Sequence, residues 1–255
     1  MYLWKYWRES RLVLGACLVG IAVLLVLICH EHLFLDAHPR FQNLLYILPS
    51  VLFVQSIPVS FVAWLYGSFG VGHDLGEKSG AYIFSRPRSR AFFVWSDWGF
   101  GLTQLLVVVT ALNIALGYEV HRMLLAVGDP YSGGILLSNK TVALTTIICL
   151  NIAASFLLSA LVFSVTYLFT VLARHAKGLM LGAFALLLYL LLKDAVKHYW
   201  PSIILPDLIP VEFAHTGQEV TGFVKDLGLS FSIRLAVILL FPLAAQFLLQ
   251  KRDIE

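Results

Sequence analysis

The chain has 255 residues, of which 59% are apolar and only 13% are charged, and its formal net charge is +3. Soluble domains carry about 25% charged residues, and a soluble protein with a mean hydropathy of +0.84 would leave large apolar patches in water. The composition therefore excludes an ordinary soluble domain and favours an integral membrane protein. The small net charge gives no support for nucleic-acid binding.

The first eleven residues, MYLWKYWRESR, predict a helix at the membrane interface. Trp4, Tyr6 and Trp7 suit the headgroup layer, and basic residues lie beside them; an unstructured anchor is the alternative. The apolar run 12–29 that follows is longer than the core of a signal peptide and has no small-residue cleavage site. It predicts an uncleaved first span.

The whole chain, 1–255, is expected to form a single all-α polytopic transmembrane domain. A helix needs about 20 mostly apolar residues to cross a bilayer. The outer segment 196–228 consists of apolar pieces interrupted by prolines, so it is expected to form broken helices in the outer leaflet, or a plain outer loop, rather than a span. The segments that predict spans are 12–29, 44–71, 98–118, 141–172, 178–195 and 229–249.

The distribution of Lys and Arg predicts the orientation of these six spans. With the N-terminus inside, eleven of the 18 Lys and Arg residues fall on the inner side, and both termini lie in the cytoplasm. The inner residues are Lys5, Arg8, Arg11, Lys78, Arg86, Arg88, Arg90, Arg174, Lys177, Lys251 and Arg252.

Intramembrane enzymes and proton-coupled carriers need ionisable groups at mid-membrane depth, and the central parts of the predicted spans contain none. The histidines show no metal-ligand spacing, so no metal site is predicted. Uncharged polar residues do occur inside the spans, and three of them are four residues apart on one helix face. They either pack against another helix or line a dimer interface or a pathway, and they are Asn113, Asn151, Ser155 and Ser159.

The inner loop 73–97 carries the most information. Its segment 72–79 is not a Walker A sequence, because three residues rather than four separate the glycines and Glu77 precedes the lysine. Residues 75–84 predict a short cytoplasmic helix, which should end before Pro87 because proline disfavours helical geometry in the residue before it. From the residues alone, a basic loop that fixes the topology is the plainest interpretation.

This loop resembles that of the membrane subunits of ATP-binding-cassette exporters of the second major permease type. In that family an acidic residue and a Gly-Thr pair precede several apolar residues and a Ser-x-Pro-x-Ser-Arg sequence. The start of the chain at 7–11 and its end at 247–254 resemble the family as well, whereas Ala81 and Asp97 depart from it. The positions that match the loop pattern are Glu77, Gly80, Ser85, Pro87, Ser89 and Arg90.

The resemblance implies a permease that exports an unidentified substrate across a bacterial cytoplasmic membrane. Catalysis and cofactors are expected on a separate ATPase subunit, which would bind ATP and Mg, and a second copy or a homologous permease is expected as a further partner. A membrane enzyme or assembly factor and an ion-coupled carrier are the alternatives. Coupling to the ATPase is expected from Glu77, Gly80, Tyr82, Phe84, Arg86, Pro87, Arg88 and Arg90.

Overall fold

The computed structural model is all-helical over the residues that it describes, which confirms the predicted fold class at that level. Its labelled helices are α1 (Tyr2–Glu31), α3 (Val71–Gly76), α5 (Arg90–Ala126), α6 (Lys140–Ala173) and α9 (Val220–Lys251). The described residues are 2–31, 55, 57–69, 71–76, 89–126, 140–173, 177–185, 187–188 and 220–251.

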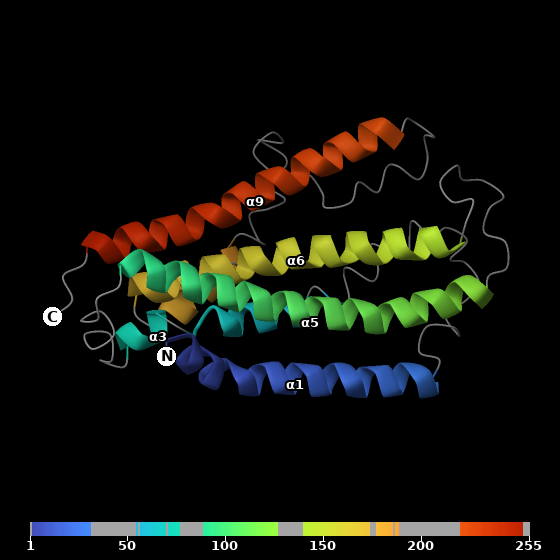
Figure 1. Cartoon of the computed structure of the whole chain (residues 1–255), viewed down its shortest axis with the longest axis horizontal. Coiled ribbons are helices and arrows are strands. Elements are labelled where there is room, and N and C mark those ends of the chain that lie inside the picture. The colour runs from blue at the N-terminus through green and yellow to red at the C-terminus, as the bar shows by residue number, and fades with distance from the viewer. Residues whose placement is uncertain are drawn as a thin grey trace.

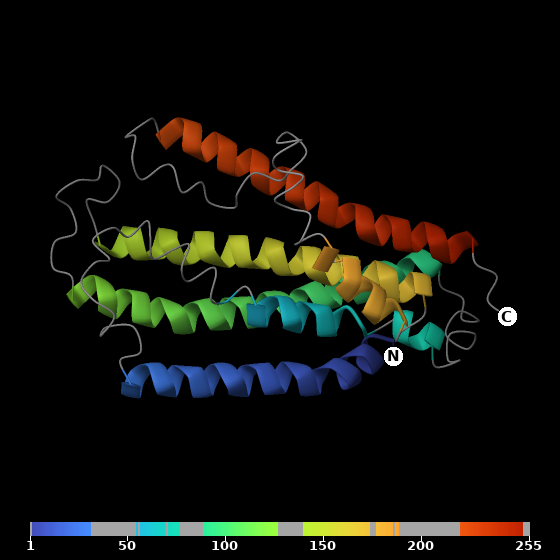
Figure 2. The same cartoon turned by 180° about the vertical axis from the view of Figure 1, so that it is seen from behind.

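The four long helices run along a common axis (Figure 1). Helices α5 and α6 pack against each other, α9 packs mainly on α6, and α1 packs on α5. The start of α1, the short helix α3, the start of α5 and the ends of α6 and α9 all lie at one end of this bundle (Figures 1 and 2). We refer to it as the α3 end of the bundle.

Each long helix contains a segment that is long and apolar enough to cross a membrane. These segments overlap four of the predicted spans, namely 12–29, 98–118, 141–172 and 229–249. The predicted spans 44–71 and 178–195 fall only partly within the described residues, where 57–66 and 177–185 are helical. The four spanning segments are Trp4–Leu27, Arg90–Tyr118, Ile148–Ala173 and Phe231–Lys251.

Three predicted boundaries differ from the structure. Helix α1 is continuous from Tyr2, so the predicted interfacial helix 1–11 is not a separate element. Of the predicted outer segment 196–228, residues up to 219 lie outside the described part, and 220–228 already belong to α9.

Helix α5 begins at Arg90 instead of residue 98, which shortens the predicted inner loop 73–97. Ser89 starts the helix, because both its carbonyl (3.0 Å) and its Oγ (3.3 Å) accept from the backbone N–H of Phe92. Asp97 was expected to lie in the loop, but it is fully buried in α5. Its Oδ2 accepts a hydrogen bond from the backbone N–H of Val71 at 2.6 Å, so the helix can bury this carboxylate.

The core lies where α5 and α6 face each other. Val94, Leu105 and Val109 of α5 meet Phe163 and Tyr167 of α6, and all of them are buried. By contrast, only 6% of the spanning window of α1 is buried, against 50% in α5 and in α6. Helix α1 is therefore a peripheral helix that touches the bundle along a narrow stripe.

Gly101 lets α5 approach both of its neighbours. A Cβ placed there would come within 2.6 Å of the Phe163 ring of α6 and within 2.8 Å of the Tyr6 hydroxyl of α1. Both of these side chains are buried, so neighbouring atoms would have to move as well. Small residues allow this close approach of helices in membranes.

We expect Gly101→Ala to destabilise the bundle and Gly99→Ala to leave it intact. Overpacking commonly costs about 1–3 kcal/mol, whereas a Cβ at Gly99 meets nothing within 4 Å and alanine is favoured over glycine in helices by about 1 kcal/mol. The apparent melting temperature of the detergent-purified chain measures both effects. Equal melting temperatures for the two variants would contradict the close approach at Gly101.

Candidate functional site

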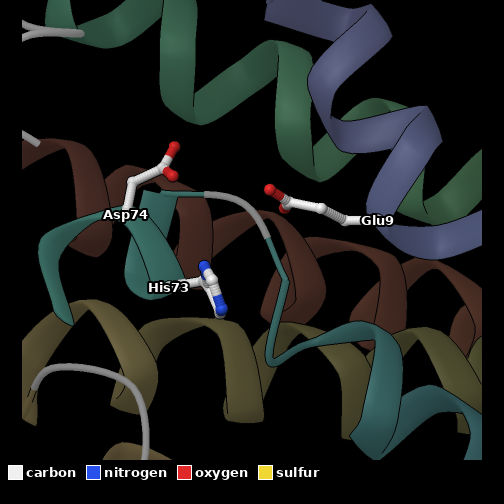
Figure 3. Close-up of side chains that lie close together, drawn as sticks. All are labelled: Glu9, His73 and Asp74. Carbon is white, nitrogen blue, oxygen red and sulfur yellow. The ribbon is translucent and has the colours of Figure 1, made fainter. Parts of the chain in front are cut away.

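Charged side chains of α1 and α3 meet at the α3 end of the bundle. Lys5 and Glu9 are one turn apart on α1, and their charged atoms are 3.7 Å apart. The Lys5 ammonium also pairs with the carboxylate of Asp74 on α3. Figure 3 shows Glu9 and Asp74 on facing elements, with His73 beside them. Asp74 is only 2% exposed, so Lys5 supplies the positive charge that this buried carboxylate requires.

Helix α3 is held from two further sides. Asp97 of α5 accepts from its first backbone N–H, that of Val71. The turn that leads into α3 contacts α6, because the Thr170 hydroxyl donates between two carbonyls, that of Tyr167 in its own helix at 2.8 Å and that of Gly67 at 3.1 Å. Side chains from three long helices thus fix the position of α3 and its approach.

Glu9, His73 and Asp74 place one nitrogen and two oxygens within 4.8 Å of one another. Such a donor set suits transition-metal ions. Here, however, the Lys5 ammonium already lies against both carboxylates, and a divalent cation would have to displace it. The arrangement is best described as an ion-pair network that joins α1 to α3.

The predicted coupling residues before Ser89 lie outside the described part of the chain. They are Glu77, Gly80, Tyr82, Phe84, Arg86, Pro87 and Arg88.

The residues on either side of this segment are described: Gly76 ends α3, and Ser89 precedes α5. Arg90 is the one predicted coupling residue that is described. Its Nη1 donates to the carbonyl of Leu249 at 2.6 Å, in the last turn of α9. Trp95 adds a second link to α9, because its indole Nε1 donates to Gln246 Oε1 at 2.8 Å. The start of α5 is therefore fastened to the end of α9.

The predicted stripe of polar residues lies inside the bundle. The Asn151 amide of α6 donates to Asn113 Oδ1 of α5 at 2.6 Å, and Gln55 Nε2 donates to the Ser155 hydroxyl. Ser159 is fully buried and donates to the carbonyl of Phe156 in its own helix. Asn113, Asn151 and Ser155 therefore link separate segments, whereas Ser159 bonds within α6. A role of the stripe at a dimer interface or a pathway stays a prediction.

Sequence reasoning missed the ion-pair network. Lys5 and Glu9 have the spacing of a helical ion pair, which was a readable signal. Their pairing with Asp74 could not be predicted from the sequence, because Lys5 and Asp74 are 69 residues apart in the chain.

We expect Lys5→Met to lower the stability of the chain, because it leaves Asp74 buried without its cation. A hydrogen bond to a charged group commonly contributes about 1.5–3 kcal/mol. In an Asp74→Asn background the same substitution should cost much less, and a double-mutant cycle on apparent melting temperatures measures this difference. Lys177→Met, at an exposed lysine, is the matched control. An equal cost of Lys5→Met in both backgrounds would show that the two residues do not interact.

Comparisons of the chain with known protein families, with curated proteins and with solved structures found no match.

Proposed function

We propose that this chain is the membrane-spanning permease subunit of an ATP-binding-cassette exporter, and that a separate ATPase subunit supplies the energy. The main support is the position of the coupling-like segment next to both ends of the chain. The segment 77–88, which resembles the coupling loop of that permease family, connects two helix ends at the α3 end of the bundle, where α1 also begins and α9 ends. Both chain termini and the coupling segment would then lie on one side of the membrane, as such a permease requires.

The directions of the helices support six spans. Helix α1 ends at the end of the bundle that is far from α3, whereas α3 begins at residue 71. The chain must therefore return along the bundle between residues 31 and 71 (Figure 1). Helix α6 ends at the α3 end and α9 starts at the opposite end, so another passage is needed between 173 and 220. In the proposed topology each passage is a further span, which with the four long helices would make six.

The charges support placing the α3 end in the cytoplasm. Arg8, Arg11, Arg90 and Lys251 belong to the helix ends that gather there. Basic residues accumulate on the cytoplasmic side of membrane proteins. The permease would accordingly have both termini inside the cell, and the ATPase would dock at this end.

Coupling follows from the contacts around α3. When the ATPase subunit closes on ATP and Mg, it displaces the segment 75–84 that rests in its groove. The displacement reaches α1 through Lys5 and Asp74, α5 through Asp97, and α9 through Arg90. The long helices then rearrange as a group, and the substrate leaves along the permease dimer.

Topology can be tested with single cysteines in a background lacking Cys17, Cys29 and Cys149. We expect Arg88→Cys and Asp253→Cys to be shielded from a membrane-impermeant thiol reagent in intact cells, because both lie on the cytoplasmic side. Gln218→Cys should react. Labelling of position 88 from outside would overturn the proposed orientation.

The coupling role can be tested with Glu77→Lys and Gly80→Trp. We expect both variants to insert at normal abundance but to recover much less ATPase subunit, roughly tenfold less, as is common when a central interface residue is lost. Recovery with the tagged chain and ATP turnover of the purified complex are the measurements. Arg88→Gln, which removes a charge from the same segment, should have a milder effect. If both variants retain normal association and turnover, the segment is not the coupling element.

A further inference from the structure

Helix α1 carries a second set of charged residues, on the face turned away from the bundle. Tyr6 and Ser10 are buried, and Gln104 of α5 donates to the Ser10 hydroxyl at 2.9 Å, which fixes the rotation of the helix. Arg8 and Arg11 point the other way and are exposed. Neither guanidinium has a hydrogen bond or an ion pair with any residue that the structure describes.

Trp4 lies on the same face of α1 as Arg8 and Arg11. It lies one turn before Arg8 and is 63% exposed, although a tryptophan of a soluble protein is rarely left so open. Positions 4, 8 and 11 of a helix share one face. An aromatic ring and two arginines therefore stand side by side, without a partner within the described bundle.

The same face continues as an apolar strip. Gly15, Val19, Ala22 and Val26 follow at helical spacing and are all exposed. A Cβ at Gly15 would meet nothing within 4 Å, so the strip is open directly below the arginines. The pattern is a cationic head followed by an apolar track that is open at Gly15.

The depth of this head matches the membrane surface. Residues 12–29 of α1 span about 27 Å at 1.5 Å per residue, which is close to the thickness of the hydrocarbon core. Arg11 then lies at the boundary of the hydrocarbon and Arg8 one turn further out, among the headgroups. Trp4 also falls in the interfacial layer, which tryptophan prefers.

We propose that this outer face of α1 binds an anionic phospholipid. Arg8 and Arg11 hold the phosphate, since guanidinium groups bind phosphate with paired hydrogen bonds. One acyl chain lies along Gly15, Val19 and Val26. The preference for an anionic lipid arises because a zwitterionic headgroup carries its own cation, which competes with the two arginines.

A second copy of this chain fits the face less well. In a symmetric dimer within one membrane, the same patch of both copies would meet. Arg8 and Arg11 of one copy would then face their equivalents in the other, and like charges would oppose the contact. An anionic lipid removes that repulsion.

The test is native mass spectrometry of the full chain, purified in detergent and supplied with phosphatidylglycerol or phosphatidylcholine. We expect the chain to retain phosphatidylglycerol selectively. Arg8→Gln with Arg11→Gln should lower its affinity for phosphatidylglycerol about tenfold or more and leave phosphatidylcholine unaffected. Lys177→Gln with Lys251→Gln, which removes two exposed charges elsewhere on the described helices, should retain the lipid as the unaltered chain does.

Gly15→Leu tests the apolar track. The position is open, so the variant should fold and melt as the unaltered chain does, but it should retain less phosphatidylglycerol because leucine fills the track. Unchanged lipid retention in the double arginine variant, or an equal loss in the lysine control, would overturn the proposal. It would also be overturned if Gly15→Leu left retention unchanged, or changed the oligomeric state without changing the lipid bound.

Discussion

Every polar group in a membrane-spanning bundle must find its partner within the protein, because hydrocarbon offers no water to bind it. Several hydrogen bonds between the described helices follow from this constraint. The Trp98 indole donates to the Ser164 hydroxyl, linking α5 to α6, and Gln104 reaches Ser10, linking α5 to α1. Threonines without such a neighbour donate to a carbonyl of their own helix, as Thr166 does to Val162. Since lipid tails are as apolar as leucine, these bonds and close packing decide which helices pair.

The same constraint places the charges. Asp74 and Asp97 are buried, yet both lie near the α3 end of the bundle, where Lys5 and the backbone N–H of Val71 can satisfy them. The short helix α3 thereby acquires attachments to both α1 and α5. If the adjoining segment 77–88 receives an ATPase, the residues that stabilise the fold also transmit its motion. A single set of contacts would then serve both stability and coupling.

The long apolar runs were predictable, because hydrophobicity over about 20 residues is a strong signal. The predicted span 141–172 corresponds closely to α6, which runs from Lys140 to Ala173. The start of α5 was not predictable, because a charged residue at position 97 indicates a loop unless its partner is known, and that partner is 26 residues away. Helical spacing likewise placed Asn151 and Ser155 on one face of a helix. It could not show that Asn113 of α5 is the partner of Asn151.

We propose that the segment following α3 contacts an ATP-hydrolysing subunit. The most direct measurement places a photoreactive amino acid at position 82 of the full chain in its native membrane and identifies the adduct by mass spectrometry. We expect an adduct with a protein that carries a Walker A sequence, and none when the same group is placed at position 218. A chain that cross-links at position 82 only to lipid or to proteins without a nucleotide-binding motif would contradict it.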